Sequence, residues 1–455
     1  METNMTQGKP LKLILNFIWP LLLGNTFQQL YNMVDTVIVG KFVGANALAA
    51  VGSTGTIMFL VMGLANGMAT GFTVLTSQKY GAGELEATRK TVANGVILAA
   101  IVCTILTVTS LALMHTLLTV MNTPVEIYDD AYAYISTICM GIFALVFYNL
   151  FASFLRAVGN STMPLVFLII SAFLNIILDL VFIINFHMGV RGAALATDVA
   201  QGISAILCII YIYSKVEVLR PKRKDWRLHA CYTRRQLAIG VPMALQFGIT
   251  ASGTMVMQAA INIYGAVAVA GFTAAGKVQN LLTTGMMSIG QTMAAYVGQN
   301  YGRRDMSRID EGVKEANKIG VIYSLVSGVL TILMLPYMLR MFFAADVDIN
   351  ALLPYARTYI QISVVCFIPL SMIFIFRNTI QGCGYGMTAM MLGIMEFVAR
   401  LAMAVGSMFV GSYAMAVASD AAAWLTTGFF GLFLFLRVRK RILKKWNEGT
   451  NLNLE

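Results

Sequence analysis

Charge is scarce in this sequence, and acidic charge is scarcest near its start. Charged residues make up 12% of the 455 residues, whereas a soluble domain carries about a quarter, and 58% of the chain is hydrophobic. Asp35 is the only carboxylate between Glu2 and Glu84. The apolar runs also lack the two-residue alternation of a barrel strand. These absences exclude a soluble globular domain and predict an all-α integral membrane protein.

Motifs for catalysis and for metal binding are missing as well. The sequence contains no HExxH, GxSxG, GxxxxGK[ST] or paired CxxC pattern. Its three histidines form no ligand cluster, and its six cysteines lie mostly within apolar runs. We therefore expect no enzyme, no cofactor and no resident metal, and any pumping must draw on an ion gradient or on a separate subunit.

Apolar runs long enough to cross a bilayer recur along the whole chain. Lys and Arg set their orientation: 26 of the 32 fall in segments on one side of the membrane and 4 on the other. This bias predicts a multi-pass protein of the cytoplasmic (inner) membrane with both termini in the cytoplasm, and it accounts for the net charge of +11 without a nucleic-acid partner. The twelve predicted spans lie near 12–40, 47–76, 92–115, 131–157, 164–186, 192–214, 236–262, 268–297, 316–340, 355–380, 388–410 and 414–436.

Two six-helix halves repeat each other. Gly44 matches Gly265 at an offset of 221 residues, Pro20 matches Pro242 at 222, and Gly159 matches Gly384 at 225. An even number of spans in each half gives both copies the same orientation, the layout of an alternating-access transporter with its pathway between the halves. The predicted domains are an N-terminal lobe, a basic cytoplasmic linker, a C-terminal lobe and a basic cytoplasmic tail, at 1–214, 215–235, 236–436 and 437–455.

Polar residues at one depth of the first half are the candidates for a cation site. Asp35 lies five residues before Gly40, about 7–8 Å below the outer end of its helix. Asp179 and Thr197 fall at a similar depth on later spans, and Asn175 shares a helix face with Asp179. Carboxylate, amide and hydroxyl oxygens together would suit a proton or Na⁺. Alternatively, Asp35 is interfacial and hydrated, and the amide and hydroxyl join helices.

Other buried charges and the methionines allow more than one interpretation. Glu396 and Arg400 are four residues apart and would neutralise each other. Asp198 and Asp420 occupy equivalent places in the two halves, which indicates a structural role. Flexible thioethers suit a pocket for varied apolar ligands, although they more commonly fill a helix bundle. As a substrate cavity we consider Met257, Gln258, Lys277 and Met287, with Lys277 alternatively paired to an acid.

Small residues on the second predicted span indicate close helix packing. Gly63, Gly67 and Gly71 recur every four residues and form a ridge that another helix can approach. We expect this ridge to serve packing, not chemistry.

Several long segments resemble the bacterial multidrug and toxic compound extrusion (MATE) transporters, in matching order and spacing over nearly the whole chain. These segments are PLLLGNTFQQLYNMVDTVIVGKFVGANALAAVG, GLANGMATGFTVLTSQKYGAG, LRAVGNSTMP, LNIILDLVFI and GVRGAALATDVAQ. The resemblance implies two six-helix lobes in a V shape. It also implies antiport, in which Na⁺ or H⁺ enters and a lipophilic, often cationic, drug leaves.

The family's cation site maps onto residues of the first half. An acid on helix one, an Asn and an Asp on helix five and a Thr on helix six match Asp35, Asn175, Asp179 and Thr197. An Asn on helix four also belongs to that site, and Asn149 is the nearest candidate here, although it falls in the inner half of its span. Some members have a second acidic site on helices seven and ten, where this chain has no acid.

Helix one is the moving part that the resemblance implies, because it is thought to bend near its proline when the acid is protonated. Pro20 lacks the N–H of a regular helical hydrogen bond, so a hinge there is physically reasonable. The lead hypothesis is a monomeric cation-coupled antiporter in the lipid bilayer that exports small drug-like molecules. The alternatives are a lipid-linked saccharide flippase of the same superfold and, in another class, a membrane-embedded enzyme or channel.

Overall fold

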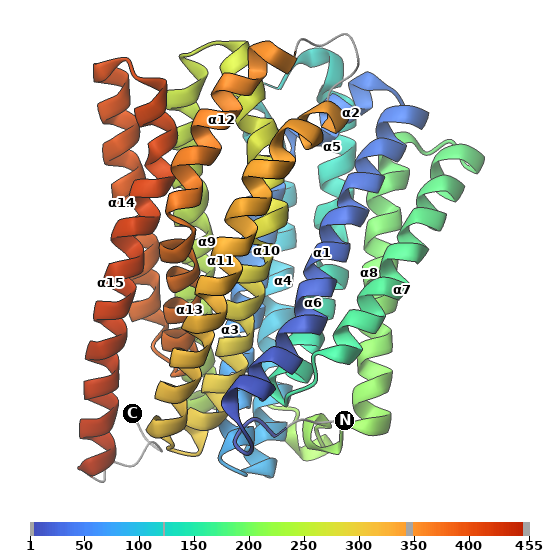
Figure 1. Ribbon diagram of the computed structural model, residues 1–455. Helices are drawn as coiled ribbons and strands as arrows, with labels where there is room; N and C mark the ends of the chain where they lie inside the picture. The colour runs from blue at the N-terminus through green and yellow to red at the C-terminus, as the bar shows by residue number, and fades with distance from the viewer. Residues whose placement is uncertain (1–3, 122, 343–348, 449–455) are drawn as a thin grey trace. The chain divides into compact units, whose positions relative to one another are not determined.

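Residues 4–121, 123–342 and 349–448 are described by the computed structural model, and in this part of the chain the regular structure is helical, with no strand. The helices form two compact units. Unit 1 contains Trp19–Leu245 with the N-terminal piece up to Gln7, and unit 2 contains Gly8–Ile18 with the chain from Gln246 onward. Within each unit the long helices run along roughly one direction (Figure 1).

Unit 1 holds most of the first eight α-helices and a short basic connection. One π-helical turn, η1 (Val181–Asn185), continues directly from α7, and two 3-10 turns at Glu217–Leu219 and Arg223–Asp225 lie between α8 and α9. The α-helices are α1 (Pro10–Phe42), α2 (Ala45–Ser53), α3 (Gly55–Gly81), α4 (Leu85–Val120), α5 (Val125–Met140), α6 (Ile142–Ala157), α7 (Thr162–Leu180) and α8 (Gly189–Lys215).

Unit 2 repeats this order of elements, including one bent pair of short helices. Its helices are the later part of α9 (Ala230–Asn262), α10 (Ala266–Gly302), α11 (Met306–Phe342), α12 (Ile349–Val365), α13 (Phe367–Gly382), α14 (Gly386–Val410) and α15 (Tyr413–Asn447).

The helices correspond to the predicted spans, and most are longer than predicted. In the described part of the chain, eight helices are long and apolar enough to cross a membrane, or ten if each bent pair, α5–α6 at 45° and α12–α13 at 54°, counts as one span. α1 and α10 are also long but are not among these ten. Hydropathy locates only the part of a helix that lies in the hydrocarbon of the membrane. The helix itself can continue into the polar region beyond it. The basic segment after residue 436 illustrates this, because it is helical up to Asn447.

Two helices are shared between the units, and both contain a proline near the division. In α1 the division falls between Ile18 and Trp19, next to Pro20, and α1 remains helical through that proline. In α9 it falls between Leu245 and Gln246, three residues after Pro242. Each proline lacks the N–H that would complete the helical ladder. The division therefore falls where each helix lacks a backbone hydrogen bond.

A buried glutamine fixes the first half of α9 to unit 1. The Gln236 amide donates to the carbonyls of Phe72 and Thr91 at 3.0 and 2.9 Å and accepts from Asn94 Nδ2 at 2.7 Å. Asn94 Oδ1 in turn accepts from the backbone N–H of His229 at 2.8 Å. Sequence reasoning did not single out Gln236, because its partners come from α3 and α4, far away in the chain.

The predicted glycine ridge on α3 packs against α9. A Cβ added to Gly71 would lie 2.5 Å from the Cα of Gly240, and one added to Gly67 would lie 2.9 Å from the Cα of Ala244. Only glycine lets two helix backbones come this close. The packing role is therefore confirmed at Gly67 and Gly71.

The internal repeat extends to backbone conformation. Gly159 and Gly384 both follow the second helix of a bent pair, and their φ angles are 86° and 87°. Gly44 and Gly265 both precede a helix, again with positive φ. Glycine adopts this region without the steric cost that other residues meet. The two halves of the sequence therefore build matching structural units.

Candidate functional site

Two acids of unit 1 meet where α1 and α7 pass each other. Asp179 is fully buried and Asp35 is half-buried, and their carboxyl groups lie within hydrogen-bonding reach. Among the described residues, neither oxygen of Asp179 nor Oδ1 of Asp35 has a hydrogen-bond partner. Two ionised carboxylates can only accept, so the pair needs a proton or a small cation to join them.

Two more of the predicted residues lie together on the neighbouring helices. Asn175 is one turn before Asp179 on α7 and is 2% exposed. Its Nδ2 donates to Thr197 Oγ1 on α8 at 3.4 Å, and the Thr197 hydroxyl donates to the Ala193 carbonyl at 3.1 Å. Asn175 Oδ1 is a further buried oxygen without a partner among the described residues. The depth argument thus selected residues that the fold does bring together.

Sequence reasoning missed a tyrosine–glutamine contact one turn away from this set. Gln201 Nε2 donates to the Tyr31 hydroxyl at 3.4 Å, and Gln201 is 2% exposed. Tyr31 precedes Asp35 by four residues and Gln201 follows Thr197 by four, so each shares a helix face with a predicted residue. The same spacing rule that linked Asn175 to Asp179 would have found both.

A third acid of unit 1, Asp198, lies against the bend between α5 and α6. Asp198 follows Thr197 on α8, and a Cβ on Gly141 would overlap its carboxyl group. Glycine at the bend therefore leaves room for a carboxylate that any larger residue would displace. Tyr134 on α5 is 4% exposed and lies within electrostatic range of Asp35, Asp179 and Asp198. Three carboxyl groups of unit 1 thus lie within electrostatic range of one buried tyrosine.

Asn149 lies on α6, and its bond stays within its own helix. Its Nδ2 donates to the Leu145 carbonyl at 2.9 Å. In the described part of the chain, Asn149 makes no hydrogen bond to Asp35, Asn175, Asp179 or Thr197.

The four residues considered for a substrate cavity belong to unit 2 and have different surroundings. Met257 is 4% exposed and belongs to a hydrophobic core cluster, whereas Met287 is 42% exposed. Gln258 donates to Asn262 Oδ1 at 2.8 Å, one turn further along α9. The Lys277 side chain is exposed on α10.

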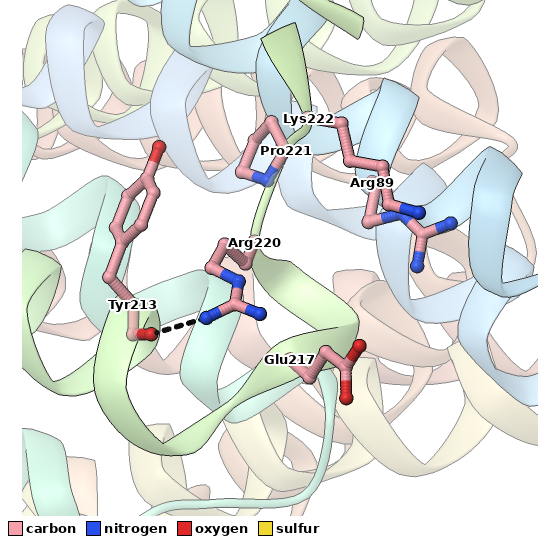
Figure 2. A pocket seen from close by; sticks show the side chains of 6 residues that line it. All are labelled: Arg89, Tyr213, Glu217, Arg220, Pro221 and Lys222. Atoms are coloured by element: carbon pink, nitrogen blue, oxygen red, sulfur yellow. Dashed lines mark hydrogen bonds between the residues drawn. The ribbon is translucent and has the colours of Figure 1, made fainter.

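A separate pocket of unit 1 has the wrong charge for a cation. It has a volume of about 210 Å³ and is formed by the start of α4, the end of α8 and the connection that follows (Figure 2). Arg220 donates to the Tyr213 carbonyl at 3.0 Å (Figure 2). The lining contains three cations and one acid, and it includes neither Asp35 nor Asp179: Arg89, Tyr213, Glu217, Arg220, Pro221 and Lys222.

The side chains near Asp35 and Asp179 supply carboxylate, amide and hydroxyl oxygens. A transition-metal centre would require a different set of ligands, and the described residues contain no group of three or more His, Cys, Asp or Glu that could hold a metal ion. Carboxylate, amide and hydroxyl oxygens instead suit Na⁺ or H⁺.

Comparisons with known proteins agree with this architecture. The probable multidrug resistance protein YpnP of Bacillus subtilis is 29% identical over 67% of this chain and 68% of its own length. The multidrug export protein MepA of Staphylococcus haemolyticus is 20% identical over 85% of this chain and 84% of its own. Among solved structures, the outward-facing conformation of a multidrug resistance MATE family transporter of the MOP superfamily has a TM-score of 0.89 at 22% identity. It covers 96% of this chain and 98% of that one.

Both halves of the sequence also match one family model. The MatE model matches residues 20–181 and 242–406, so it covers Asp35, Asn175 and Asp179 in the first half and the corresponding helices in the second. The family consists of membrane transporters, not enzymes, in accord with the absence of catalytic motifs. The chain therefore belongs to the MatE family of transporters.

Proposed function

We propose that this transporter is an antiporter that exports lipophilic, often cationic, compounds in exchange for H⁺ or Na⁺ bound at Asp35 and Asp179. The observation that carries the proposal is the acid pair itself. Three buried carboxylate oxygens at a helix crossing have no donor among the described residues. Ionisable groups within a membrane are costly and are retained where they serve transport.

Either cation fits the oxygens present. A proton on one carboxyl group would turn it into a donor to the other, which satisfies both. Na⁺ would instead draw on the carboxylates, on Asn175 Oδ1 and on the Thr197 hydroxyl oxygen, all of which are hard ligands. Either event adds positive charge to the pair and draws α1 and α7 toward one another. We also propose Asn149 as a ligand of the cation. It could bind the cation only after a change in the conformation of α6.

Movement of α1 is the second part of the proposal. We infer that α1 bends at Pro20 when the acid pair takes up its cation. Two features support this hinge: the missing backbone N–H at Pro20, and the change from unit 2 to unit 1 at the adjacent Trp19. A bend there would connect the charge of the pair to the conformation of the helix that carries Asp35.

We propose that residues of unit 2 bind the drug. Met287, Gln258 and Lys277 offer apolar and polar contacts, with Met257 behind them in the core. We further propose a monomer of the cytoplasmic membrane with both termini in the cytoplasm. Its lobes, linker and tail are 1–214, 236–436, 215–235 and 437–455.

Efflux of a fluorescent cationic dye from membrane vesicles tests the coupling. A pH gradient and a Na⁺ gradient are imposed separately, and one of them should drive dye movement in the wild type. Asp35→Asn should abolish gradient-driven movement while the protein still reaches the membrane. Asp129→Asn makes the same chemical change at an exposed acid and should leave transport intact. Full transport activity of Asp35→Asn would show that Asp35 is not part of the mechanism. If cells that produce the protein gain resistance to no dye or drug, drug export is refuted.

A further inference from the structure

Unit 2 contains a buried ion cluster centred on Arg400. Arg400 Nη2 lies 2.8 Å from Glu396 Oε1 on the same helix, which confirms the pairing predicted from their spacing. Arg400 Nε lies 2.8 Å from Asp420 Oδ1 on α15. All three residues are 5% exposed or less. One guanidinium group therefore pairs with two acids in the interior of the unit, which leaves one negative charge to be balanced.

Neighbouring polar groups complete the cluster. The Tyr359 hydroxyl donates to Asp420 Oδ2 at 3.0 Å, and Gln279 Nε2 donates to that hydroxyl at 3.0 Å. Arg377 on α13 lies within electrostatic range of Glu396 and of Arg400. Its guanidinium N–H groups donate to the Gln246 amide oxygen at 2.8 and 3.1 Å when that amide is oriented to satisfy its neighbours. Among the described residues Arg377 forms no ion pair with these acids, but its charge and that of Arg400 together equal the charge of Glu396 and Asp420.

The cluster lies at positions equivalent to Asn175 of the cation site of unit 1 and to residues near that site. Helices α7 and α14 repeat each other at an offset of 225 residues, and buried and exposed positions alternate in nearly the same order along both. At this offset Asn175 corresponds to Arg400 and Ser171 to Glu396. Tyr134, the buried tyrosine within electrostatic range of the acids of unit 1, corresponds to Tyr359 at the same offset.

The remaining positions correspond in the same way. Asp198 in Ala-Thr-Asp matches Asp420 in Ala-Ser-Asp at an offset of 222. At the same offset, Pro20 corresponds to Pro242 and Asp35 corresponds to Met257. At the offset of 225, Asp179 corresponds to Ala404. Unit 2 therefore has neither acid of the pair found in unit 1, and it has an arginine where unit 1 has the amide of Asn175.

We propose that Arg400 is a built-in cation that occupies the unit-2 counterpart of the cation site, and that it confines the exchangeable cation to unit 1. The inference rests on the proposed coupling function and adds to it the reason why one unit alone takes up the ion. The acids of unit 2 are already paired to a cation that cannot leave. They therefore contribute no exchangeable site while Arg400 is present.

Replacing Arg400 with the residue found at the equivalent position of unit 1 should open the counterpart site. In Arg400→Asn, Glu396 and Asp420 remain without their ion-pair partner, and counting the more distant Arg377, the described residues of the cluster carry one net negative charge. One Na⁺ or one proton would restore neutrality. Arg400→Lys is the matched control, because it retains the fixed charge and should bind no additional cation.

The experiment compares purified Asp35→Asn with the double variant Asp35→Asn/Arg400→Asn, so that the site of unit 1 is disabled in both. Bound radioactive sodium and proton uptake are measured per chain, together with Tm. We expect the double variant to gain one bound Na⁺ or H⁺. Its Tm should rise by about 1–2 °C for each tenfold increase in that cation. Adding Arg400→Lys to the same background should change neither quantity.

Two results would overturn the inference. One is a folded double variant that binds no additional cation and whose Tm does not depend on the cation. The other is a double variant that fails to fold even at about pH 5 and in about 0.5 M NaCl, where protons and Na⁺ are abundant enough to replace Arg400. A failure of the coupling proposal is distinguishable, because it appears as equal cation binding in the wild type and in Asp35→Asn.

Discussion

Asp35→Asn should make the protein more stable while it abolishes transport. In the wild type, Asp35 Oδ1 and both oxygens of Asp179 are buried without a donor among the described residues. The amide introduced at position 35 is nearly the size of the carboxyl group and supplies two N–H donors to Asp179. It thereby performs permanently what a bound proton performs reversibly.

The size of the effect follows from the groups involved. Leaving a buried acceptor unpaired costs about 1–3 kcal/mol, and a hydrogen bond to a charged group contributes about 1.5–3 kcal/mol. We expect Asp35→Asn to raise the free energy of unfolding by about 1–3 kcal/mol near pH 8, and Tm by about 1–3 °C. The advantage should shrink as the pH falls, because a proton then gives the wild type the same donor.

Thermal unfolding followed by the fluorescence of the four tryptophans measures this difference in detergent. Asp35→Ala removes the charge without supplying a donor, so it should raise Tm by less than Asp35→Asn does. Asp129→Asn should unfold at the wild-type temperature, since Asp129 is exposed. If Asp35→Asn unfolds at a lower temperature than the wild type near pH 8, the two acids are not held together without a donor and the reasoning fails.

Three further outcomes follow from the contacts described. Gly71→Ala should cost about 1–3 kcal/mol by forcing α3 away from the backbone of α9, whereas Gly276→Ala, which meets no atom within 4 Å, should be neutral or stabilising by thermal unfolding. Gln236→Ala should cost about 3 kcal/mol or more, because it leaves Asn94 and two carbonyls of unit 1 unpaired, and a loss under 1 kcal/mol would contradict the network. Pro20→Ala should raise Tm and slow dye efflux in vesicles, since it completes the hydrogen bonding of α1 where the hinge is proposed, and unchanged efflux would contradict that hinge.

The sequence alone predicted the features that depend on neighbouring residues or on the membrane. A bilayer requires long apolar helices, so the spans and their repetition could be located from hydropathy and spacing. The cost of a charge in hydrocarbon drew attention to Asp35. The four-residue spacing of a helix joined Asn175 to Asp179 and Glu396 to Arg400, and the second of these pairs is confirmed.

Only the tertiary structure could show which of these residues meet across helices. It brings Asp35 to Asp179 and Arg400 to Asp420. It also shows that Gly141 makes room for the carboxyl group of Asp198, a contact between residues far apart in the chain. Contacts of this kind depend on how helices cross, and no local pattern records a crossing. The sequence therefore determined where the costly charges lie, and the fold decided that one unit leaves its acids without a donor while the other supplies an arginine.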